Sequence, residues 1–387
     1  MYNIQTLNKI AAVGTSRLGD NYNVADEVQN PDAILVRSAS MHDMELPESL
    51  LAIARAGAGV NNIPLDKCAE KGIVVFNTPG ANANAVKELV ITALLLSSRK
   101  VVDGIEWAKT LKGNGDAVGK MVEKGKSQFV GPEIMGKTLG IIGLGAIGIL
   151  VANAAVALGM DVIGYDPYLS VDSALLLSRK VKHATTQDEI FENSDYITIH
   201  VPLTPDTKGV INSENIAKMK DGVRIINFSR ADLAVSADVL KALEDKKVAA
   251  YATDFATDDI LGVDGVIALP HLGASTPESE DNCAKMAADE IKDYLENGNI
   301  KNSVTMPAVS MAKTGAARVC VIHKNIPNML SSICAKLSET GNNIESMASQ
   351  SKKDYSYSIL DTANDVTDAS VDAIKSIDGV IRVRVIK

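Results

Sequence analysis

At 387 residues the chain exceeds one ordinary domain, so two or three domains are expected. Its 46% hydrophobic content is typical of a soluble globular protein, and its formal net charge of −9 argues against broad nucleic-acid or anionic-membrane binding. No N-terminal segment combines a basic start with an apolar run, so no signal peptide is visible. The apolar stretch 89–96 is shorter than the roughly 20 residues of a membrane span, and we therefore expect a cytoplasmic protein. The scattered cysteines, without a Cys-x-x-Cys pair, favour structural thiols and argue against a zinc or other metal site: Cys68, Cys283, Cys320 and Cys334.

The N-terminal 77 residues alternate short apolar strands with helical stretches. Strands are predicted at residues 33–36 and 72–76, with a glycine-rich turn at 55–60 between them. Residues 84–102 form a helical pattern long enough to connect two lobes. Residues 103–136 are polar and contain several glycines, and they are predicted to form a helix and a further segment that leads into the following domain.

A glycine-rich turn at residues 143–148 is the most informative motif. An apolar strand at 138–142 leads into Gly143, Gly145 and Gly148 in the order Gly-x-Gly-x-x-Gly, and a helix is predicted at 149–158. A second strand ends at Asp166, 18 residues beyond Gly148. Such a turn lets a pyrophosphate approach the backbone and a helix N-terminus, and the acid binds ribose hydroxyls and repels a 2′-phosphate. The pattern indicates an NAD site rather than a purely structural turn.

Further strands are predicted after this motif, at residues 195–200, 224–228, 249–254 and 266–269, with a helix at 238–246 among them. Strands alternating with helices indicate a doubly wound parallel sheet. Ligand groups gather at the carboxyl ends of such strands. Four polar sites fall there: His200, Ser229 with Arg230, Asp254 and His271.

The C-terminal part is predicted to be a separate module. A helix at 275–297 returns the chain to the first lobe, and residues 306–317 form a linker. Strands at 318–322, 345–351, 355–361 and 380–386, with helices at 328–340 and 368–377, give the ferredoxin-like order βαββαβ. The expected domains are a substrate lobe (1–77 and 274–305), an NAD-binding domain (78–273), the linker and a regulatory module (318–387).

Several stretches together resemble one enzyme family. They are residues 36–39, 55–62, 77–82, 200–204, 226–230 and 270–276, in addition to the glycine-rich turn. The first roughly 305 residues are similar to the D-isomer-specific 2-hydroxyacid dehydrogenases, which implies an α/β fold with two Rossmann-like doubly wound lobes. The tail resembles an ACT domain, a small amino-acid-sensing module, through residues 323–327 and 341–344.

The resemblance implies three catalytic residues for hydride transfer between a hydroxy acid and NAD. His271 suits the general base because its ordinary pKa lies near neutrality, and Arg230 suits the substrate carboxylate and C2 oxygen. The family places a Glu-Pro pair where this chain has Asp259 and Ile260, 29 residues past Arg230 and 12 before His271. Asp259 is the predicted orienting acid, with Asp258 as the fallback. Ala231 also replaces the usual glycine.

The binding residues follow from the same resemblance. The cofactor set is Gly143, Gly145, Ala146, Ile147, Gly148, Asp166, His200, Val201, Pro202, Thr207, Ser229, Asp254 and Gly273. Asp254 is expected either to bind the nicotinamide amide or merely to cap a strand, and His200 to lie near the cofactor. The substrate set is Arg37, Arg55, Gly59, Val60, Arg230 and His271, with Lys9 as a weaker candidate. His42 and His183 are expected at the surface.

The implied substrate is 3-phosphoglycerate, oxidised to 3-phosphohydroxypyruvate at the start of serine synthesis. The tail is expected to bind L-serine through His323, Asn325 and Asn343, in a homodimer or homotetramer, although Asn328 stands where that motif often has glycine. An ACT fold retained only for assembly is the plainer alternative. Another 2-hydroxy acid as substrate, or a non-catalytic sensor of NAD(H) and an amino acid, remain the alternative functions.

Overall fold

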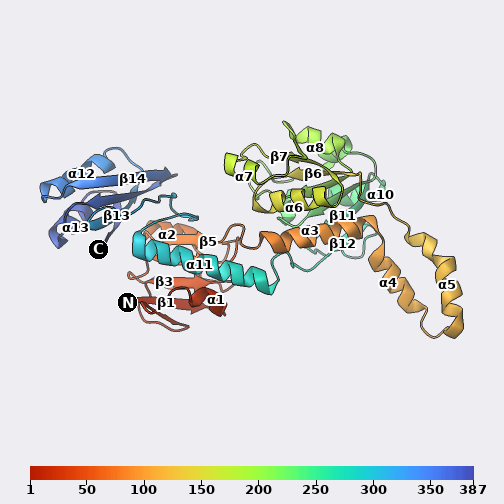
Figure 1. Cartoon of the computed structure of the whole chain (residues 1–387), viewed down its shortest axis with the longest axis horizontal. Coiled ribbons are helices and arrows are strands. Elements are labelled where there is room, and N and C mark those ends of the chain that lie inside the picture. The colour runs from red at the N-terminus through yellow and green to blue at the C-terminus, as the bar shows by residue number, and fades with distance from the viewer. The chain divides into compact units, whose positions relative to one another are not determined.

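The structure, a computed structural model, describes residues 1–387 and divides into two compact units. One unit comprises residues 1–82 and 277–387, and the other comprises residues 83–276. Figure 1 traces both by colour along the chain. None of the helices combines the length and apolar character that crossing a membrane requires.

The first 82 residues form a five-stranded parallel sheet in the order β2-β1-β3-β4-β5. Its strands are β1 (Tyr2–Leu7), β2 (Tyr22–Ala25), β3 (Ala33–Val36), β4 (Ala52–Arg55) and β5 (Val74–Asn77). The helices of this lobe are α1 (Ala12–Thr15), α2 (Leu65–Glu70) and α11 (Pro277–Asn297). β3 is buried along its whole length, as expected for an apolar strand of a parallel sheet covered on both faces. The predicted doubly wound fold is confirmed for this lobe.

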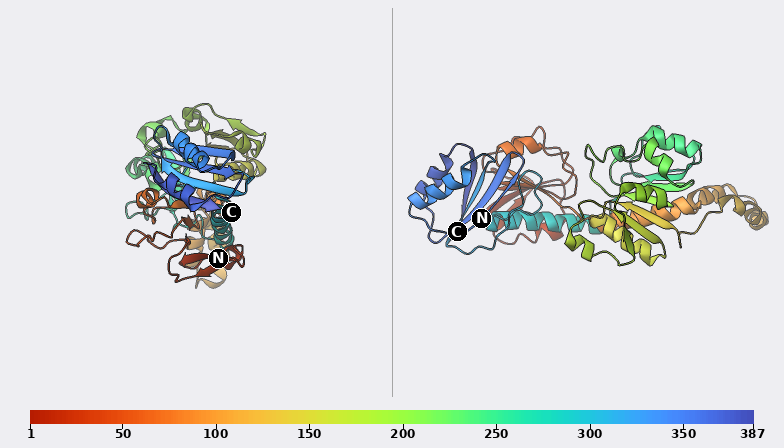
Figure 2. Two further views of the ribbon diagram at one scale, coloured as in Figure 1. Left: turned by 90° about the vertical axis from the view of Figure 1, so that its left-hand side faces the viewer. Right: turned by 90° about the horizontal axis from the view of Figure 1, so that it is seen from above.

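The C-terminal part forms a four-stranded antiparallel sheet in the order β14-β15-β13-β16. Its elements, in chain order, are β13 (Ala317–Lys324), α12 (Met329–Glu339), β14 (Ile344–Lys352), β15 (Tyr355–Thr362), α13 (Asp368–Lys375) and β16 (Val380–Ile386). Both helices cover the same face of the sheet (Figure 2). The predicted βαββαβ order is confirmed.

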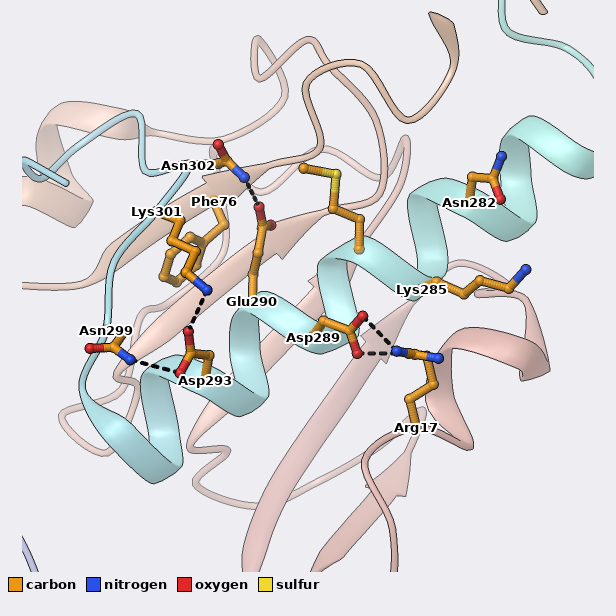
Figure 3. Close-up of a pocket in the computed structure, with 11 residues that line it drawn as sticks. Arg17, Phe76, Asn282, Lys285, Asp289, Glu290, Asp293, Asn299, Lys301 and Asn302 are labelled. Atoms are coloured by element: carbon orange, nitrogen blue, oxygen red, sulfur yellow. Dashed lines mark hydrogen bonds and ion pairs between the residues drawn. The ribbon is translucent and has the colours of Figure 1, made fainter. Parts of the chain in front are cut away.

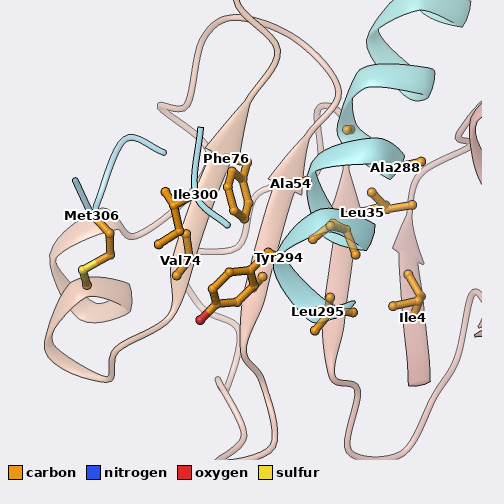
Figure 4. Close-up of a cluster of buried hydrophobic side chains, with 14 of the residues drawn as sticks. Ile4, Leu35, Ala54, Val74, Phe76, Ala288, Tyr294, Leu295, Ile300 and Met306 are labelled. Carbon is orange, nitrogen blue, oxygen red and sulfur yellow. The ribbon is translucent and has the colours of Figure 1, made fainter. Parts of the chain in front are cut away.

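The other face of this antiparallel sheet shares a hydrophobic core with the first lobe. Figure 4 shows the lobe's part of this core, with Tyr294 and Leu295 of α11 beside residues of β3, β4 and β5. Cys320, Ile322 and Tyr357 of the C-terminal sheet belong to the same cluster. The C-terminal module and the first lobe therefore share one hydrophobic core and are not two independent domains joined by a linker.

Polar contacts reinforce this junction. Arg382 of β16 donates to the carbonyl oxygens of Leu50 and Lys71, at 2.8 and 3.0 Å. The Tyr357 hydroxyl donates to the carbonyl oxygen of Gly298 at 2.6 Å. A fully buried bidentate ion pair between Arg318 and Asp361, with its closest atoms 2.7 Å apart, lies at the start of the module. Since buried charges are stable only when paired and hydrogen-bonded, this end of the module holds one arrangement.

Residues 83–276 contain a seven-stranded parallel sheet in the order β12-β11-β10-β9-β6-β7-β8. The strands are β6 (Thr138–Ile142), β7 (Asp161–Tyr165), β8 (Val181–His183), β9 (Tyr196–Ile199), β10 (Val223–Asn227), β11 (Val248–Thr253) and β12 (Val266–Ala268). Counted from β6 this is the strand order of a dinucleotide-binding fold, and its topology reverses between β6 and β9. The predicted Rossmann-like domain is confirmed.

The helices of this unit are α3 (Ala83–Ser98), α6 (Ala146–Ala157), α7 (Val171–Leu175), α8 (Gln187–Asn193), α9 (Ser213–Lys218) and α10 (Ser236–Glu244), with the short helix η3 (Ala231–Leu233). Residues 101–129 form an arm that extends from the rest of this unit (Figure 1), made of α4 (Val101–Thr110), η1 (Gly115–Ala117), α5 (Val118–Gly125) and η2 (Lys126–Phe129). No residue of α4 or α5 is buried. The arm leaves apolar side chains exposed, among them Val101, Val102 and Ile105.

Candidate functional site

The turn between β6 and α6 has an open face suited to a phosphate group. Gly143 has φ +95°, in the left-handed region that glycine favours, and a Cβ there would lie 2.6 Å from the carbonyl oxygen of His200. A Cβ at Gly148 would collide with the carbonyl oxygen of Gly143, so α6 packs against the turn only because this residue is glycine. A Cβ at Gly145 would meet no atom within 4 Å. That open space, at the N-terminus of α6 where Ala146 and Ile147 begin the helix, fits a pyrophosphate.

Asp166 lies at the end of β7 and is bound to this turn. Its Oδ2 accepts from the backbone amide of Leu144 and its Oδ1 from that of Tyr168, both at 2.9 Å. Each carboxylate oxygen retains a lone pair, because an ionised carboxylate offers about four acceptor positions. The acid is thus fixed beside the turn and keeps capacity for ribose hydroxyls.

The residues after β9 and β10 lie at the same edge of the sheet. The Ser229 hydroxyl donates to the carbonyl oxygen of Ile199 at 2.7 Å, which joins the ends of these two strands. Desolvation by burial lowers the pKa of His200 to about 3, so its ring is neutral, and its buried Nδ1 has no hydrogen-bond partner. Val201 and Pro202 follow directly, and the Thr207 hydroxyl donates to the carbonyl oxygen of Pro202 at 2.6 Å.

Arg230 is positioned by an asparagine that the sequence analysis did not single out. Asn227, buried at the end of β10, donates from Nδ2 to the carbonyl oxygen of Arg230 at 2.9 Å and accepts from the Ser229 amide at 3.2 Å. Arg230 itself is exposed, and its Nη1 donates to the carbonyl oxygen of Ser229 at 2.6 Å. The signal for Asn227 was its place one residue from the strand end, within the matched stretch 226–230.

Asp254 lies buried at the end of β11, and its charge interacts with those of His271 and Arg230. Burial raises the pKa of Asp254 above its usual range, while these two positive charges and the backbone amide of Gly273 act in the opposite direction. The Gly273 amide donates to Asp254 Oδ2 at 3.4 Å, whereas Oδ1 is buried without a partner. An unpaired buried acceptor suits a ligand that offers an N–H group, such as a nicotinamide amide.

His271 is exposed and held against Phe255 by an edge contact, with the ring centroids 5.1 Å apart. No ion pair or hydrogen bond joins His271 to Asp259 or Asp258. Asp259 is exposed on a turn whose amides at Ile260 and Leu261 donate to the carbonyl oxygen of Thr257. The pairing of His271 with Asp259, expected from the sequence, is therefore not formed in this conformation, and the positive charge of His271 instead acts to lower the pKa of Asp254.

In the first lobe, the candidate substrate residues lie at the carboxyl ends of β3 and β4. Arg37 forms an ion pair with Glu280 of α11 at 2.7 Å, and Arg55 donates from Nε to the carbonyl oxygen of Arg37 at 3.0 Å. A Cβ at Gly57, where φ is +153°, would collide with the Arg55 guanidinium. The backbone amides of Gly59 and Val60 make no hydrogen bond within the protein. Lys9 is exposed after β1, and His42 and His183 are exposed as expected.

The C-terminal module has a polar pocket of about 320 Å³. His323, Asn325, Asn328, Ser349, Ser351 and Ser356 are among its lining residues. His323 is buried and its Nε2 lies 3.0 Å from the Ser358 hydroxyl, while Asn325 donates to the carbonyl oxygen of Lys353 at 3.0 Å. Asn328 has φ +68°, which explains why glycine also suits this position.

Asn343 does not lie with His323 and Asn325. It directly precedes β14, whose first residue Ile344 pairs with Thr362, whereas His323 pairs with Ser356 near the other end of the sheet. The six-residue difference along β15 corresponds to roughly 20 Å at the rise of a β-strand. Within one copy of the chain, the pocket therefore contains only two of the three predicted residues.

A larger pocket of about 650 Å³ lies along one side of α11 (Figure 3). Most of its charged side chains are already paired, as Arg17 is with Asp289 at 2.7 Å and Lys301 with Asp293 at 3.2 Å. Glu290 is buried, accepts from Asn302 Nδ2 at 2.6 Å and keeps an unpartnered Oε2. Desolvation raises the pKa of Glu290 to about 8, which makes it a neutral acid at neutral pH.

Comparison with known proteins identifies these units. Residues 91–273, which include the whole seven-stranded sheet, match the family "D-isomer specific 2-hydroxyacid dehydrogenase, NAD binding domain". The D-3-phosphoglycerate dehydrogenase of Methanocaldococcus jannaschii is 34% identical over 321 residues, covering 81% of this chain and 59% of that protein. That of Bacillus subtilis is 35% identical over 308 residues, covering 77% and 56% respectively.

A solved structure agrees with these matches. The NAD⁺-bound 3-phosphoglycerate dehydrogenase of Entamoeba histolytica aligns with a TM-score of 0.58 and 26% identity, over 78% of this chain and 98% of that one. The chain spans only a little over half the length of the curated relatives it matches. Its open glycine turn, the fixed Asp166 and the matched segment agree: residues 91–273 are similar to the NAD-binding domain of the D-isomer specific 2-hydroxyacid dehydrogenases.

Proposed function

We propose that this chain is an NAD-dependent dehydrogenase of D-2-hydroxy acids, with D-3-phosphoglycerate as its substrate. The observation that carries the proposal is the electrostatic cluster of Arg230, Asp254 and His271 at the strand ends of a dinucleotide-binding sheet. An arginine, a histidine and a buried acid beside a dinucleotide turn form the combination that hydride transfer from an alcohol requires.

The residues have separate roles in this reaction. NAD, when bound, supplies the hydride acceptor, so that the alcohol becomes a ketone as NAD⁺ becomes NADH. His271 takes the proton of the C2 hydroxyl and returns it in the reverse reaction. Arg230 binds the C1 carboxylate with its planar guanidinium and polarises the C2 oxygen. Asp254 stabilises the charged form of His271, and Asp259 remains the candidate for doing so once substrate is bound.

The substrate assignment rests on anion-binding groups in the first lobe. Arg37 and Arg55 are proposed to bind the phosphate, and the free amides of Gly59 and Val60 to bind a carboxylate. Arg37 already has a partner in Glu280, so a phosphate must compete with that carboxylate. The curated relatives and one solved structure carry the name of the phosphoglycerate enzyme, which supports this substrate. Other solved structures of similar fold are named glyoxylate reductase and D-lactate dehydrogenase, so the substrate needs a direct test.

NADH oxidation by the purified full chain tests this function. We expect 3-phosphohydroxypyruvate to give a kcat/KM well above those of pyruvate, glyoxylate and hydroxypyruvate. A higher value for an unphosphorylated 2-oxo acid would keep the chemistry and replace the substrate. NADH binding without turnover of any 2-oxo acid would support the alternative of a non-catalytic sensor.

The pocket of the C-terminal module supports a second function, binding of L-serine. Its polar lining suits the carboxylate, ammonium and hydroxyl of a small amino acid, and His323 and Asn325 are proposed to contact it. Asn343 lies at the other end of the sheet, so we propose that it reaches the site from a second copy of the chain. The exposed edge strand β14 and the apolar arm of residues 101–129 support a homodimer or homotetramer.

A further inference from the structure

The side-chain ammonium of Lys352 is hydrogen-bonded to backbone carbonyls of a segment that borders the sheet of the first lobe. At the end of β14, its Nζ donates to the carbonyl oxygens of Ser303 and Val304, at 2.9 and 3.2 Å. No carboxylate lies within ion-pair distance of it. The side chain is half-buried, and desolvation lowers its pKa. The two carbonyl contacts, rather than a surface ion pair, hold its Nζ.

The segment that Lys352 binds completes the edge of the first lobe's sheet. β5 is the outermost strand of that sheet, and residues 302–305 lie along it. The Val304 amide donates to the carbonyl oxygen of Val75 at 2.8 Å, and the Thr305 hydroxyl accepts from the Val75 amide at 2.9 Å. The Lys352 ammonium adds two hydrogen bonds to this segment.

β5 in turn holds the turn with the free amides. Asn77, its last residue, donates from Nδ2 to the carbonyl oxygen of Ala58 at 2.7 Å. The next residue, Thr78, donates its backbone amide to the carbonyl oxygen of Gly57 at 3.1 Å. Residues 55–60 are therefore bound to the carboxyl end of β5. β5 itself is paired with β4 on one side and with the segment that Lys352 binds on the other.

The residue before Lys352 lies in the pocket of the C-terminal module. Ser351 lines that pocket and lies 2.8 Å, hydroxyl to hydroxyl, from Ser356 of β15. Adjacent residues of a strand point to opposite faces of the sheet. The end of β14 therefore presents Ser351 to the pocket and Lys352 to the segment at residues 302–305.

We infer that Lys352 is a positioning residue, through which the C-terminal module sets the anion-binding turn at residues 55–60. This inference rests on the proposed function in one respect, namely that residues 55–60 bind the substrate. It requires no movement of the other unit, because every contact in the series lies within residues 1–82 and 277–387. A ligand bound in the pocket at Ser351 would then affect the substrate-binding turn at residues 55–60 through the end of β14.

The decisive variant is Lys352→Met, which keeps the length of the side chain and removes the donor. We expect KM for the 2-oxo acid to rise roughly three- to tenfold while kcat changes little, the pattern of a lost ground-state binding contribution. Lys352→Arg retains the donors and should restore most of the affinity. Lys353→Met is the matched control, because it removes the neighbouring lysine, whose side chain makes no hydrogen bond or ion pair with residues 302–305.

Amide hydrogen exchange separates this inference from the proposed function. In Lys352→Met, the amides of Val304 and Thr78 should exchange faster than in wild type, whereas those of β6 and β7 should not change. This readout needs no substrate, so a wild-type protein without turnover would refute the function and still test the role of Lys352. Unchanged exchange at these amides together with an unchanged KM would overturn the inference, and so would equal effects of Lys353→Met.

Discussion

Asp166 Oδ2 accepts a hydrogen bond from the backbone amide of Leu144 at 2.9 Å, so the acid at the end of β7 also braces the glycine-rich turn. Its other oxygen accepts from the Tyr168 amide at the same distance. The residue that we propose selects the cofactor is thus part of the turn's own hydrogen-bonding structure. We expect substitution at this position to change cofactor choice and turn geometry together.

Asp166→Ala should narrow the preference for NADH over NADPH and also weaken NADH binding. The repulsion of a 2′-phosphate disappears, but Leu144 and Tyr168 lose a charged acceptor, worth about 1.5–3 kcal/mol per hydrogen bond. Steady-state KM values for both cofactors measure this. Asp161→Ala, at the exposed opposite end of β7, is the control. Equal use of NADPH by the wild-type protein would contradict the role of Asp166.

His271→Ala should lower kcat by about 10²–10⁴-fold, the usual effect of losing a general base. NADH binding, followed by fluorescence titration, should stay close to wild type because the glycine turn lies on other strands. The control is His183→Ala, at an exposed position on β8. Wild-type turnover by His271→Ala would remove this residue from the mechanism.

The pH profile of hydroxy-acid oxidation distinguishes Asp254 from Asp259. A nearby negative charge raises the pKa of a histidine, so its removal should move the limb due to His271 to lower pH. Since kcat/KM reports the free enzyme, Asp254→Asn should shift that profile. Asp259→Asn should shift only the kcat profile, which reports the substrate complex. An unchanged limb in both variants, with a shift in Asp258→Asn, would transfer the role to Asp258.

Glu290 should make the stability of the protein depend on pH. Its folded pKa of about 8 lies above the usual 4.5, so the folded state binds the extra proton between these values. Its contribution is complete below about pH 4.5 and is lost as the pH rises through 8. Glu290→Gln should therefore raise Tm relative to wild type at pH 9 but not at pH 5. Glu278→Gln, exposed on the same helix, should show no such trend.

Calorimetry with L-serine tests the pocket of the C-terminal module. Binding should be lost in Asn325→Ala and retained in Asn364→Ala, which is exposed outside the pocket. If a second copy supplies Asn343, Asn343→Ala should also lose binding while its own fold is unchanged by circular dichroism. Absence of a heat signal with the wild-type protein would leave the module as an assembly element.

Local patterns were enough to predict much of this protein. The glycine spacing predicted the turn at residues 143–148. At Gly143 and Gly148 a Cβ would clash with a nearby backbone carbonyl, either within the turn or after the neighbouring strand. The order of elements in the C-terminal module followed from alternating and helical hydrophobic patterns. The strands β1, β2 and β4 were missed, since they contain polar or small residues, whereas β3 and β5, just as short as β2 and β4, stand out as runs of large apolar residues.

Other features depended on contacts between distant residues. Arg382 meets the carbonyl oxygen of Leu50 across 332 positions, and no local pattern announces such a junction. Asn343 was grouped with His323 because both follow recognisable motifs, but the register of β14 on β15 separates them. The acid near His271 was assigned by counting along the chain, and the electrostatic interaction between His271 and the buried Asp254 could not be read from that spacing.

The common core of the first lobe and the C-terminal module has a consequence for how this protein can change over evolution. Gly298 packs so closely on Cys320 that a Cβ there would lie 2.5 Å from the sulfur. A foreign module fused at residues 306–317 would have to reproduce the surface around Cys320 as well as the hydrogen bonds that Arg382 donates to the first lobe. A module of this kind cannot be exchanged freely between proteins, because the lobe and its module must vary together. A chain cut at residue 306 should therefore lose the cooperative unfolding transition of the lobe.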